Sequence, residues 1–235
     1  MKIMPLSQPA YQRRTFFRTI ASAAGLALVG CATTHQTIGE MTHPEQEEAE
    51  VTPGEDLMQE HGVLERILLI YDEVIRRTDH QESFDSALVV RAADIVRRFV
   101  ENYHEKLEEE FVFPRLQAAQ RETELVAILL RQHQRGRELT DTILSRARSG
   151  APSDLAPILR SFGRMYRPHA AREDTVLFPA FRDTVGRSAY RELGEQFEER
   201  EHYQFGEHGF QTVVAEVASI ERALSIHDLA RFTPA

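Results

Sequence analysis

HEKLEEEFVFP, residues 104–114, and HAAREDTVLFP, residues 169–179, are two versions of one stretch. Each begins with a histidine, carries a glutamate four residues later and ends in a Phe-Pro pair at the same offset. Both lie among strong helix formers, and positions i and i+4 of a helix share one face, one turn apart. Each copy is therefore predicted to present an imidazole beside a carboxylate on a helix.

The hydrophobic pattern around these stretches predicts an all-α fold, an antiparallel four-helix bundle with an additional C-terminal helix. The expected helices cover residues 55–78, 84–120, 123–149, 154–184 and 187–224. Ser83 is expected to cap the second helix, and Pro114 to kink it or end its first part. Pro168 should bend the fourth helix beside His169. Apolar and polar residues do not alternate with a period of two over any length, so we expect no sheet.

Length and composition narrow the class of protein. A chain of 235 residues has room for one domain and an appendage. Its net charge of −9 and the lack of a basic stripe give no reason to expect a nucleic-acid partner. Cys31 is the only cysteine, which excludes an intramolecular disulfide and a cysteine-based zinc site. No apolar run reaches the roughly 18 residues that a membrane-spanning helix needs.

Residues 1–30 have the order of an export signal, with basic residues first and then a short apolar run. The pair Arg13-Arg14, followed by Thr-Phe-Phe, resembles the twin-arginine export signal. Leu-Val-Gly before Cys31 resembles the lipobox of bacterial lipoproteins. The resemblance implies cleavage before Cys31, lipidation of its thiol and a periplasmic or cell-envelope location. The other interpretations are an amphipathic N-terminal helix, or an ordinary signal with an incidental cysteine.

Residues 31–54 are acidic and poor in apolar side chains, which predicts a flexible tether. The folded domain is then expected over residues 55–235, with the core bundle in 55–185 and the C-terminal helix in 187–224. The histidines outside the predicted helical seams are interpreted as tether, loop or tail residues. They are His35, His43, His80 and His227.

Several metal-ligating side chains fall on or beside the apolar faces of the predicted helices. They are His61, His104, Glu108, His133, His169 and Glu173. Glutamate is rarely buried unless it is paired, and burying such groups without partners costs several kcal/mol each. A pair of divalent cations removes that cost, because neutral imidazole and ionised carboxylate both bind metal. Each half of the bundle supplies one histidine and one His-x-x-x-Glu pair, which predicts a dinuclear site in the core.

Nitrogen and oxygen donors without a thiolate favour iron, with manganese or zinc as alternatives. Glu108 and Glu173, one from each half, are the natural bridging carboxylates. Glu105 is a further candidate ligand, although it lies about 100° round the helix from His104. A single histidine on an apolar face is usually a core residue. The repeat of the whole pattern is what favours the metal site.

This pattern resembles the hemerythrin-like family of His-His-Glu cation-binding domains. The match covers about residues 55–185 and rests on the six candidate ligands. Oxygen-carrying members use a fifth histidine where this chain has Arg137, which leaves an open or carboxylate-filled position and argues against simple oxygen carriage. They also use His-x-x-x-x-Asp on the last bundle helix, so Asp174 competes with Glu173 for the bridging role. We favour Glu173, because it repeats Glu108 on the seam.

The resemblance implies an exported non-haem di-iron protein that binds or reacts with O2, NO or peroxide. Peroxide- or NO-handling activity would make it an enzyme. The alternative is a non-enzymatic iron-binding, iron-buffering or redox-sensing protein, and a zinc-stabilised structural bundle is a weaker third. Tyr71, Tyr103 and Tyr166 lie near the ligand rows, where they either donate to a bound ligand or belong to the core.

The C-terminal helix carries an acidic stretch with two further candidates, Glu201 and His202. One interpretation is a lid over the bundle, with either residue as an extra ligand or a proton relay. The other is a solvated helix face packed by Phe197, Phe205 and Phe210. Gly206 and Gly209 lie inside this segment and weaken it as a helix.

Overall fold

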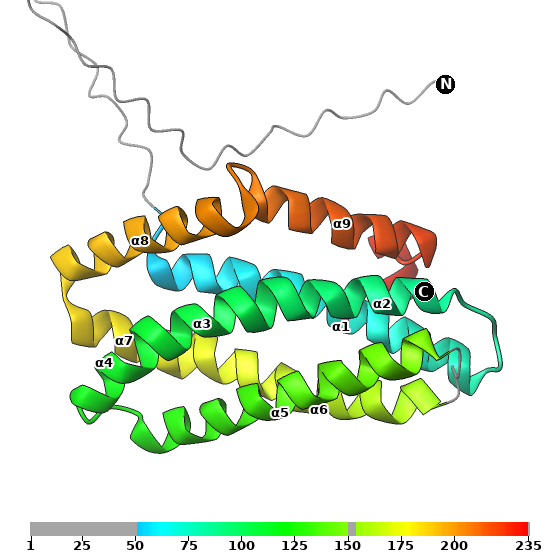
Figure 1. The fold of residues 1–235 in the computed structure, drawn as a ribbon, viewed down its shortest axis with the longest axis horizontal. Helices are drawn as coiled ribbons and strands as arrows, with labels where there is room; N and C mark the ends of the chain where they lie inside the picture. The colour runs from blue at the N-terminus through cyan, green and yellow to red at the C-terminus, as the bar shows by residue number, and fades with distance from the viewer. Residues whose placement is uncertain (1–50, 150–153, 235) are drawn as a thin grey trace, which may run out of the picture. The chain divides into compact units, whose positions relative to one another are not determined.

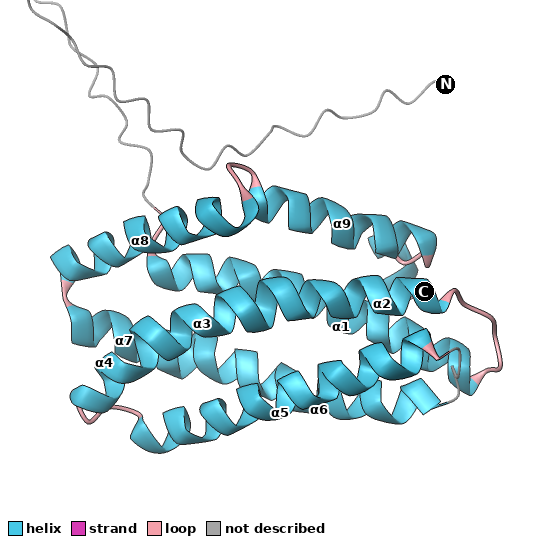
Figure 2. Cartoon of the chain, viewed as in Figure 1, coloured by secondary structure: helices cyan, strands magenta, loops and turns pink. Residues whose placement is uncertain are grey.

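The computed structural model describes residues 51–149 and 154–234, and the regular elements in these ranges are all helical (Figure 2). The prediction of an all-α fold is confirmed. Arg13, Arg14 and Cys31 of the expected export signal lie outside the described residues, as does nearly all of the expected tether. Within the described ranges, no helix combines the length and hydropathy needed to cross a bilayer.

The first helix, α1 (Pro53–Asp79), begins two residues earlier than predicted. Thr52 and Glu55 form a capping box, in which the Thr52 hydroxyl accepts from the Glu55 N–H and Glu55 accepts from the Thr52 N–H at 2.9 Å. Proline at the first helical position costs no hydrogen bond, because that N–H has no partner inside the helix. Residues 53 and 54, which we expected at the end of the acidic tether, are therefore the first residues of the bundle.

The second run of helix follows a six-residue connection, residues 80–85, and is capped by a different residue from the one we predicted. Asp85, and not Ser83, caps it, because the Asp85 carboxylate accepts from the Ala87 N–H at 2.9 Å. The run consists of α2 (Ser86–Ile95), η1 (Val96–His104), α3 (Glu105–Leu107), η2 (Glu108–Val112) and α4 (Phe113–Ala118). The turns of η1 and η2 are π-helical and wider than α-helical turns.

The second half of the bundle repeats this plan. Its first helix is α5 (Thr123–Arg148), as predicted within one residue. The next run consists of α6 (Leu155–Arg172), the π-helical η4 (Glu173–Leu177) and α7 (Phe178–Val185). Pro168 lies inside α6, which continues to Arg172.

The repeated Phe-Pro pair builds the same local structure in both halves. The Phe113 N–H donates to the Glu108 carbonyl, and the Phe178 N–H donates to the Glu173 carbonyl, each across five residues. A proline at the next position has no N–H and its ring crowds the preceding turn, which the wider π-helical turn accommodates. The helical run therefore continues past Pro114, where we expected a kink or an end.

These segments form an antiparallel four-helix bundle (Figure 1), in which α1 packs against α6 and α2, and α5 packs against α2 and α6. The predicted apolar seams form its buried core. The apolar spacing also placed Ile75, Phe111 and Val176 on these faces, and they are only half-buried.

The C-terminal segment is two helices, and the prediction of one helix over 187–224 was wrong. α8 (Arg187–Phe205) ends at Gly206, whose φ of 82° favours glycine, and α9 (Gly209–Ala223) follows after a short break. Both helices lie along α1 (Figure 1), and α9 also contacts α2. Arg66 on α1 pairs with Glu221 on α9, with Nε and Oε1 2.8 Å apart. A single 3-10 turn, η5 (Leu229–Phe232), follows.

Gly136 on α5 leaves the space that the Tyr166 side chain of α6 fills. A Cβ at this position would lie 1.9 Å from the Tyr166 hydroxyl oxygen and 2.7 Å from its Cζ. We expect Gly136→Ala to lower the free energy of unfolding by about 1–3 kcal/mol, the usual cost of overpacking a core. Guanidinium unfolding measures this, with Gly62→Ala as control, because a Cβ on exposed Gly62 meets nothing within 4 Å. Equal stability of the two variants would contradict the prediction.

Candidate metal centre

Four histidines from four different helical runs meet in the middle of the bundle. His61 comes from α1, His104 from η1, His133 from α5 and His169 from α6. All four are buried, with His133 fully inaccessible. The Nε2 atoms of His61 and His104 are 3.0 Å apart, and the rings of His133 and His169 lie 5.1 Å apart between centroids. The structure thus brings together all four histidines that the sequence indicated.

Two fully buried carboxylates lie among these imidazoles, and each one contacts histidines of both halves. Glu108 is 3.7 Å from His104 Nε2 and 3.3 Å from His133 Nε2. Glu173 is 3.1 Å from His169 Nε2 and 3.4 Å from His61 Nε2. This placement is the one expected of carboxylates that bridge two metal ions.

The other ring nitrogen, Nδ1, of each histidine points outward to a polar partner. The four pairs are His61 with Asp174 at 2.7 Å, His104 with Glu60 at 2.8 Å, His133 with Glu109 at 3.1 Å and His169 with Gln132 at 2.9 Å. Ionised carboxylates and the Gln132 amide oxygen only accept hydrogen bonds, so these partners assign the ring proton to Nδ1. Each Nε2 then presents a lone pair to the interior, which is how metal-binding histidines are held.

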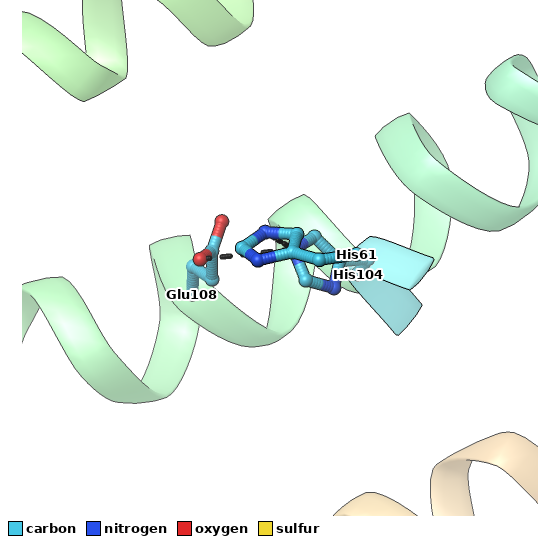
Figure 3. A group of neighbouring side chains, drawn as sticks. All are labelled: His61, His104 and Glu108. Atoms are coloured by element: carbon cyan, nitrogen blue, oxygen red, sulfur yellow. Dashed lines mark hydrogen bonds and ion pairs between the residues drawn. The ribbon is translucent and has the colours of Figure 1, made fainter. Parts of the chain in front are cut away.

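Figure 3 shows His61 and His104 side by side with Glu108 next to them. With protons on both Nδ1 atoms, two Nε2 lone pairs face each other at 3.0 Å. Lone pairs at this distance repel unless a cation or a proton lies with them. This contact therefore indicates a place for positive charge.

The buried atoms of the centre fit a bound cation. Both carboxylate oxygens of Glu108 and of Glu173, and Nε2 of His133, are buried without a hydrogen-bond partner in the described chain. The 3.1 Å approach of Glu173 to His169 lacks hydrogen-bond geometry. Unpaired buried groups of this kind are costly, and coordination to a metal removes the cost. Two sets of three donors, which together contain all six candidate ligands, could each hold an ion: His61, His104 and Glu108, and His133, His169 and Glu173. A further set, Glu105, Glu109 and His133, shares His133 with the second.

The two carboxylates have opposite pKa shifts in the metal-free centre. Burial raises the pKa of Glu108 well above its usual value, and the charge of Glu173 raises it further. Burial also acts to raise the pKa of Glu173, but His169 and His61 outweigh it and hold that pKa well below its usual value. Without metal, Glu108 therefore holds a proton more readily than Glu173 does.

The neighbouring histidines His61 and His104 also have opposite pKa shifts. Burial acts to lower the pKa of His61, but its contacts with Asp174 and Glu173 raise it from 6.5 to about 9. The pKa of His104 is well below its usual value, because of burial and the charge of His61. Protons thus supply the positive charge of the centre when no metal does, and metal binding must displace them.

The stability of metal-free protein is expected to fall as pH rises from about 6.5 to about 9. Folded His61 keeps a proton that the unfolded chain releases in this window, so its contribution is complete below pH 6.5 and is lost through pH 9. Buried Glu105, whose pKa is raised to about 8, adds a loss in the same direction. Guanidinium unfolding at the two pH values measures the fall, and His61→Gln should reduce it. A rise in stability over this window would refute the assignment.

Arg137, at the position of the fifth histidine of oxygen carriers, turns away from the histidine nitrogens. It donates to Glu105 at 2.7 Å and to Glu109 at 2.6 Å. Glu105 also accepts from Tyr166 at 2.8 Å, and its nearest approach to the imidazoles is 4.0 Å from Nδ1 of His133. Glu105 therefore lies in the shell around the centre, together with Arg137 and Tyr166.

The structure places the remaining candidate residues outside the set of six donors. Asp174 lies on the outward nitrogen of His61, and Glu173 lies on the inward one. Glu201 is buried beside Asp56 and Glu60, outside the histidine groups, and His202 is exposed. Three tyrosines belong to the core with at most 1% of their surface exposed: Tyr71, Tyr103 and Tyr166. His80 and His227 are exposed, as expected.

Three residues that orient histidines were missed by the sequence reasoning: Glu60, Glu109 and Gln132. Each is adjacent in sequence to a candidate ligand, so its side chain leaves the helix about 100° from that ligand. A polar residue next to each ligand was the available signal. It is weak, because polar residues are common at the edge of any helical seam.

The fold and the centre define a metal-binding helical bundle with clustered histidines and glutamates. The chain belongs to the hemerythrin HHE cation binding domain family, whose model matches residues 52–181. It is also similar to uncharacterised proteins of Mycobacterium bovis and Mycobacterium tuberculosis, each 46% identical over 99% of this chain and 95% of the relative. No solved structure matches significantly.

Proposed function

We propose that this protein is a non-haem di-iron protein that binds or reacts with O2, NO or peroxide. The proposed ligands are His61, His104, Glu108, His133, His169 and Glu173. The observation that carries the proposal is the convergence of buried, unpaired donor atoms on one region of the core, with each carboxylate between histidines of the two halves. Nitrogen and oxygen donors alone suit iron, with manganese or zinc as alternatives.

A bound iron pair would supply redox chemistry and open positions for a small ligand. Residues of the chain orient the proposed ligands for it. Asp174, Glu60, Glu109 and Gln132 hold the imidazoles with their Nε2 atoms inward. Arg137 in turn holds Glu109 against His133 and thereby acts as a positioning residue.

Buried aromatic rings stack on two of the proposed ligands, one in each half of the bundle. Phe178 stacks on His61 at 5.6 Å between ring centroids, and Phe113 stacks on His133 at 5.4 Å. A dry cavity strengthens the electrostatic interactions inside it and restricts access to small ligands. Burial and the support of every histidine also oppose rapid release of metal, which favours a reactive or sensing centre over an iron buffer.

The test is metal analysis and optical spectroscopy of the purified protein. We expect iron as the main metal and near-ultraviolet charge-transfer bands that change on addition of O2, azide or NO. Zinc without iron would overturn the proposal. Iron with unchanged bands would favour the non-enzymatic alternative, an iron-binding or iron-buffering protein. Turnover of peroxide or NO that is lost in His169→Ala would identify an enzyme.

Export and a lipid anchor are part of the same proposal. They are supported by the Arg13-Arg14 pair, by the apolar run after it and by the position of the single cysteine, Cys31. The expected location is the periplasm or cell envelope, attached to a membrane through the lipid. Fractionation of a bacterial host tests this, because Cys31→Ser should move the protein from the membrane to the soluble fraction. Unchanged membrane attachment of that variant would rule out the lipid at Cys31.

A further inference from the structure

The two sets of three donors in the centre differ in the residues that orient their histidines. In chain order, they are the first position, made of His61, His104 and Glu108, and the second position, made of His133, His169 and Glu173. The imidazoles of the first position donate from Nδ1 to carboxylates, those of Asp174 at 2.7 Å and Glu60 at 2.8 Å. The imidazoles of the second donate to the neutral amide oxygen of Gln132 at 2.9 Å and to Glu109 at 3.1 Å.

Glu60 and Gln132 occupy equivalent places in the repeated pattern. Each precedes the first ligand histidine of its half and accepts from Nδ1 of the histidine in the following His-x-x-x-Glu pair. An ionised acceptor makes a stronger hydrogen bond than a neutral one, and it raises the basicity of the imidazole that it holds. The Nε2 of His104 is therefore a stronger donor to a metal than the Nε2 of His169.

Asp174 and Glu109 are also equivalent, because each follows a candidate bridging glutamate and orients a histidine of the opposite half. Arg137 donates to Glu109 at 2.6 Å, and the Lys106 ammonium forms an ion pair with it. Among the residues that the structure describes, Asp174 forms no ion pair with an arginine or a lysine. Since two cations draw on the charge of Glu109, it supports its histidine less strongly than Asp174 does.

The inward carboxylates do not produce this difference. Glu108 and Glu173 each contact the Nε2 of one histidine from either position, so both carboxylates are shared. Each position also has the same donor types, two imidazoles and one carboxylate. The charge of the outward partners therefore distinguishes the two positions.

We propose that the two metal positions differ in affinity, and that the pair of Glu60 and Gln132 sets this difference. The proposal rests on the dinuclear site of the proposed function. The first position binds its ion more tightly, and the second is filled last and emptied first. The chain then holds a single ion when metal is scarce, so the occupancy of the second position follows the metal supply.

The experiment is a titration of the metal-free full chain with Co²⁺, followed by calorimetry and visible absorption. Nitrogen and oxygen donors bind Co²⁺ whichever divalent metal is the physiological one. We expect two steps in the wild type, with dissociation constants about tenfold or more apart. Glu60→Gln keeps an acceptor for His104 and removes the charge, so it should weaken the tighter step by about 10–100-fold. Gln132→Glu should strengthen the weaker step by about tenfold or more.

The same changes at exposed neighbours on the same helices are the matched controls. Glu65→Gln and Gln134→Glu should titrate like the wild type. Circular dichroism checks the fold, and Gln132→Glu decides the test if Glu60→Gln does not fold. Two equal affinities in the wild type would overturn the proposal. A Glu60→Gln or Gln132→Glu variant that folds and titrates like its control would do the same.

Failure of the proposed function gives a different result. A protein that is purified with zinc and without iron, but binds two Co²⁺ in separate steps that the variants shift as expected, fails as a di-iron protein and retains unequal positions. Two equal steps in a protein purified with iron leave the di-iron proposal intact and refute the difference in affinity. Binding of fewer than two Co²⁺ would overturn both.

Discussion

Glu173→Ala is expected to abolish stable binding of the proposed iron pair while leaving the helical fold intact. Glu173 is fully buried and lies 3.1 Å from His169 and 3.4 Å from His61, so it is the carboxylate closest to imidazoles of both halves. Alanine removes its negative charge and the group proposed to bridge the metal ions. The remaining carboxylate, Glu108, cannot balance two divalent cations alone.

Iron analysis after dialysis measures this result, and circular dichroism checks the fold. Asp174→Asn is the graded comparison, because it changes only the outward partner of His61 and should weaken metal binding by about 10–100-fold. Asp183→Ala, an exposed carboxylate on α7, should bind iron like the wild type. Normal iron content in Glu173→Ala would refute the ligand assignment.

Phe178→Ala should produce a large loss of stability, because Phe178 is one of two buried phenylalanines that stack on histidines of the centre. The ring is 98% inaccessible and stacks on His61 with an interplanar angle of 23°. Removing a buried phenylalanine side chain typically lowers the free energy of unfolding by 3–5 kcal/mol, that is by about 4 kcal/mol here. Phe113→Ala should give a similar loss, because Phe113 stacks on His133 in the same way.

Chemical denaturation of the metal-free variants separates this packing effect from the loss of metal. Phe178→Leu keeps most of the volume and should lose markedly less stability. Phe232→Ala is the exposed control, with 52% of its surface accessible, and should change stability by less than about 0.5 kcal/mol. A loss below about 1 kcal/mol in Phe178→Ala would contradict the stacking role, because the ring would then not support the core.

The supporting contacts of the centre connect its two halves. Glu60 precedes His61 in the sequence and accepts a hydrogen bond from His104 of the same half. Likewise, Gln132 precedes His133 and accepts a hydrogen bond from His169 of the same half. The residues that follow the two candidate bridging glutamates act across the halves. Glu109 supports His133, and Asp174 supports His61. A change in Glu109 or Asp174 should therefore affect a histidine of the opposite helix pair.

The errors in the predicted helices have local physical causes. A cap depends on which side-chain oxygen reaches a free N–H, and Asp85 reaches the Ala87 N–H where Ser83 was expected to cap. The glycines of the last segment were recognised as weakening a helix. Whether the chain breaks there depends on the φ of Gly206 and on the Glu201 contact that begins α9. Sequence periodicity continues across such a break, because both helices bury the same face.

Apolar spacing and the repeated His-x-x-x-Glu were enough to predict the helical class, the bundle and the candidate ligands, because these local patterns lie on single helices. Which groups face each other became visible only in the packed bundle. It placed Glu173 between His169 and His61, put Asp174 behind His61, and turned Arg137 toward Glu105 and Glu109. It also brought Glu201 beside α1. These relations join residues far apart in the chain, and their geometry depends on how the helices pack and rotate, which no local pattern encodes.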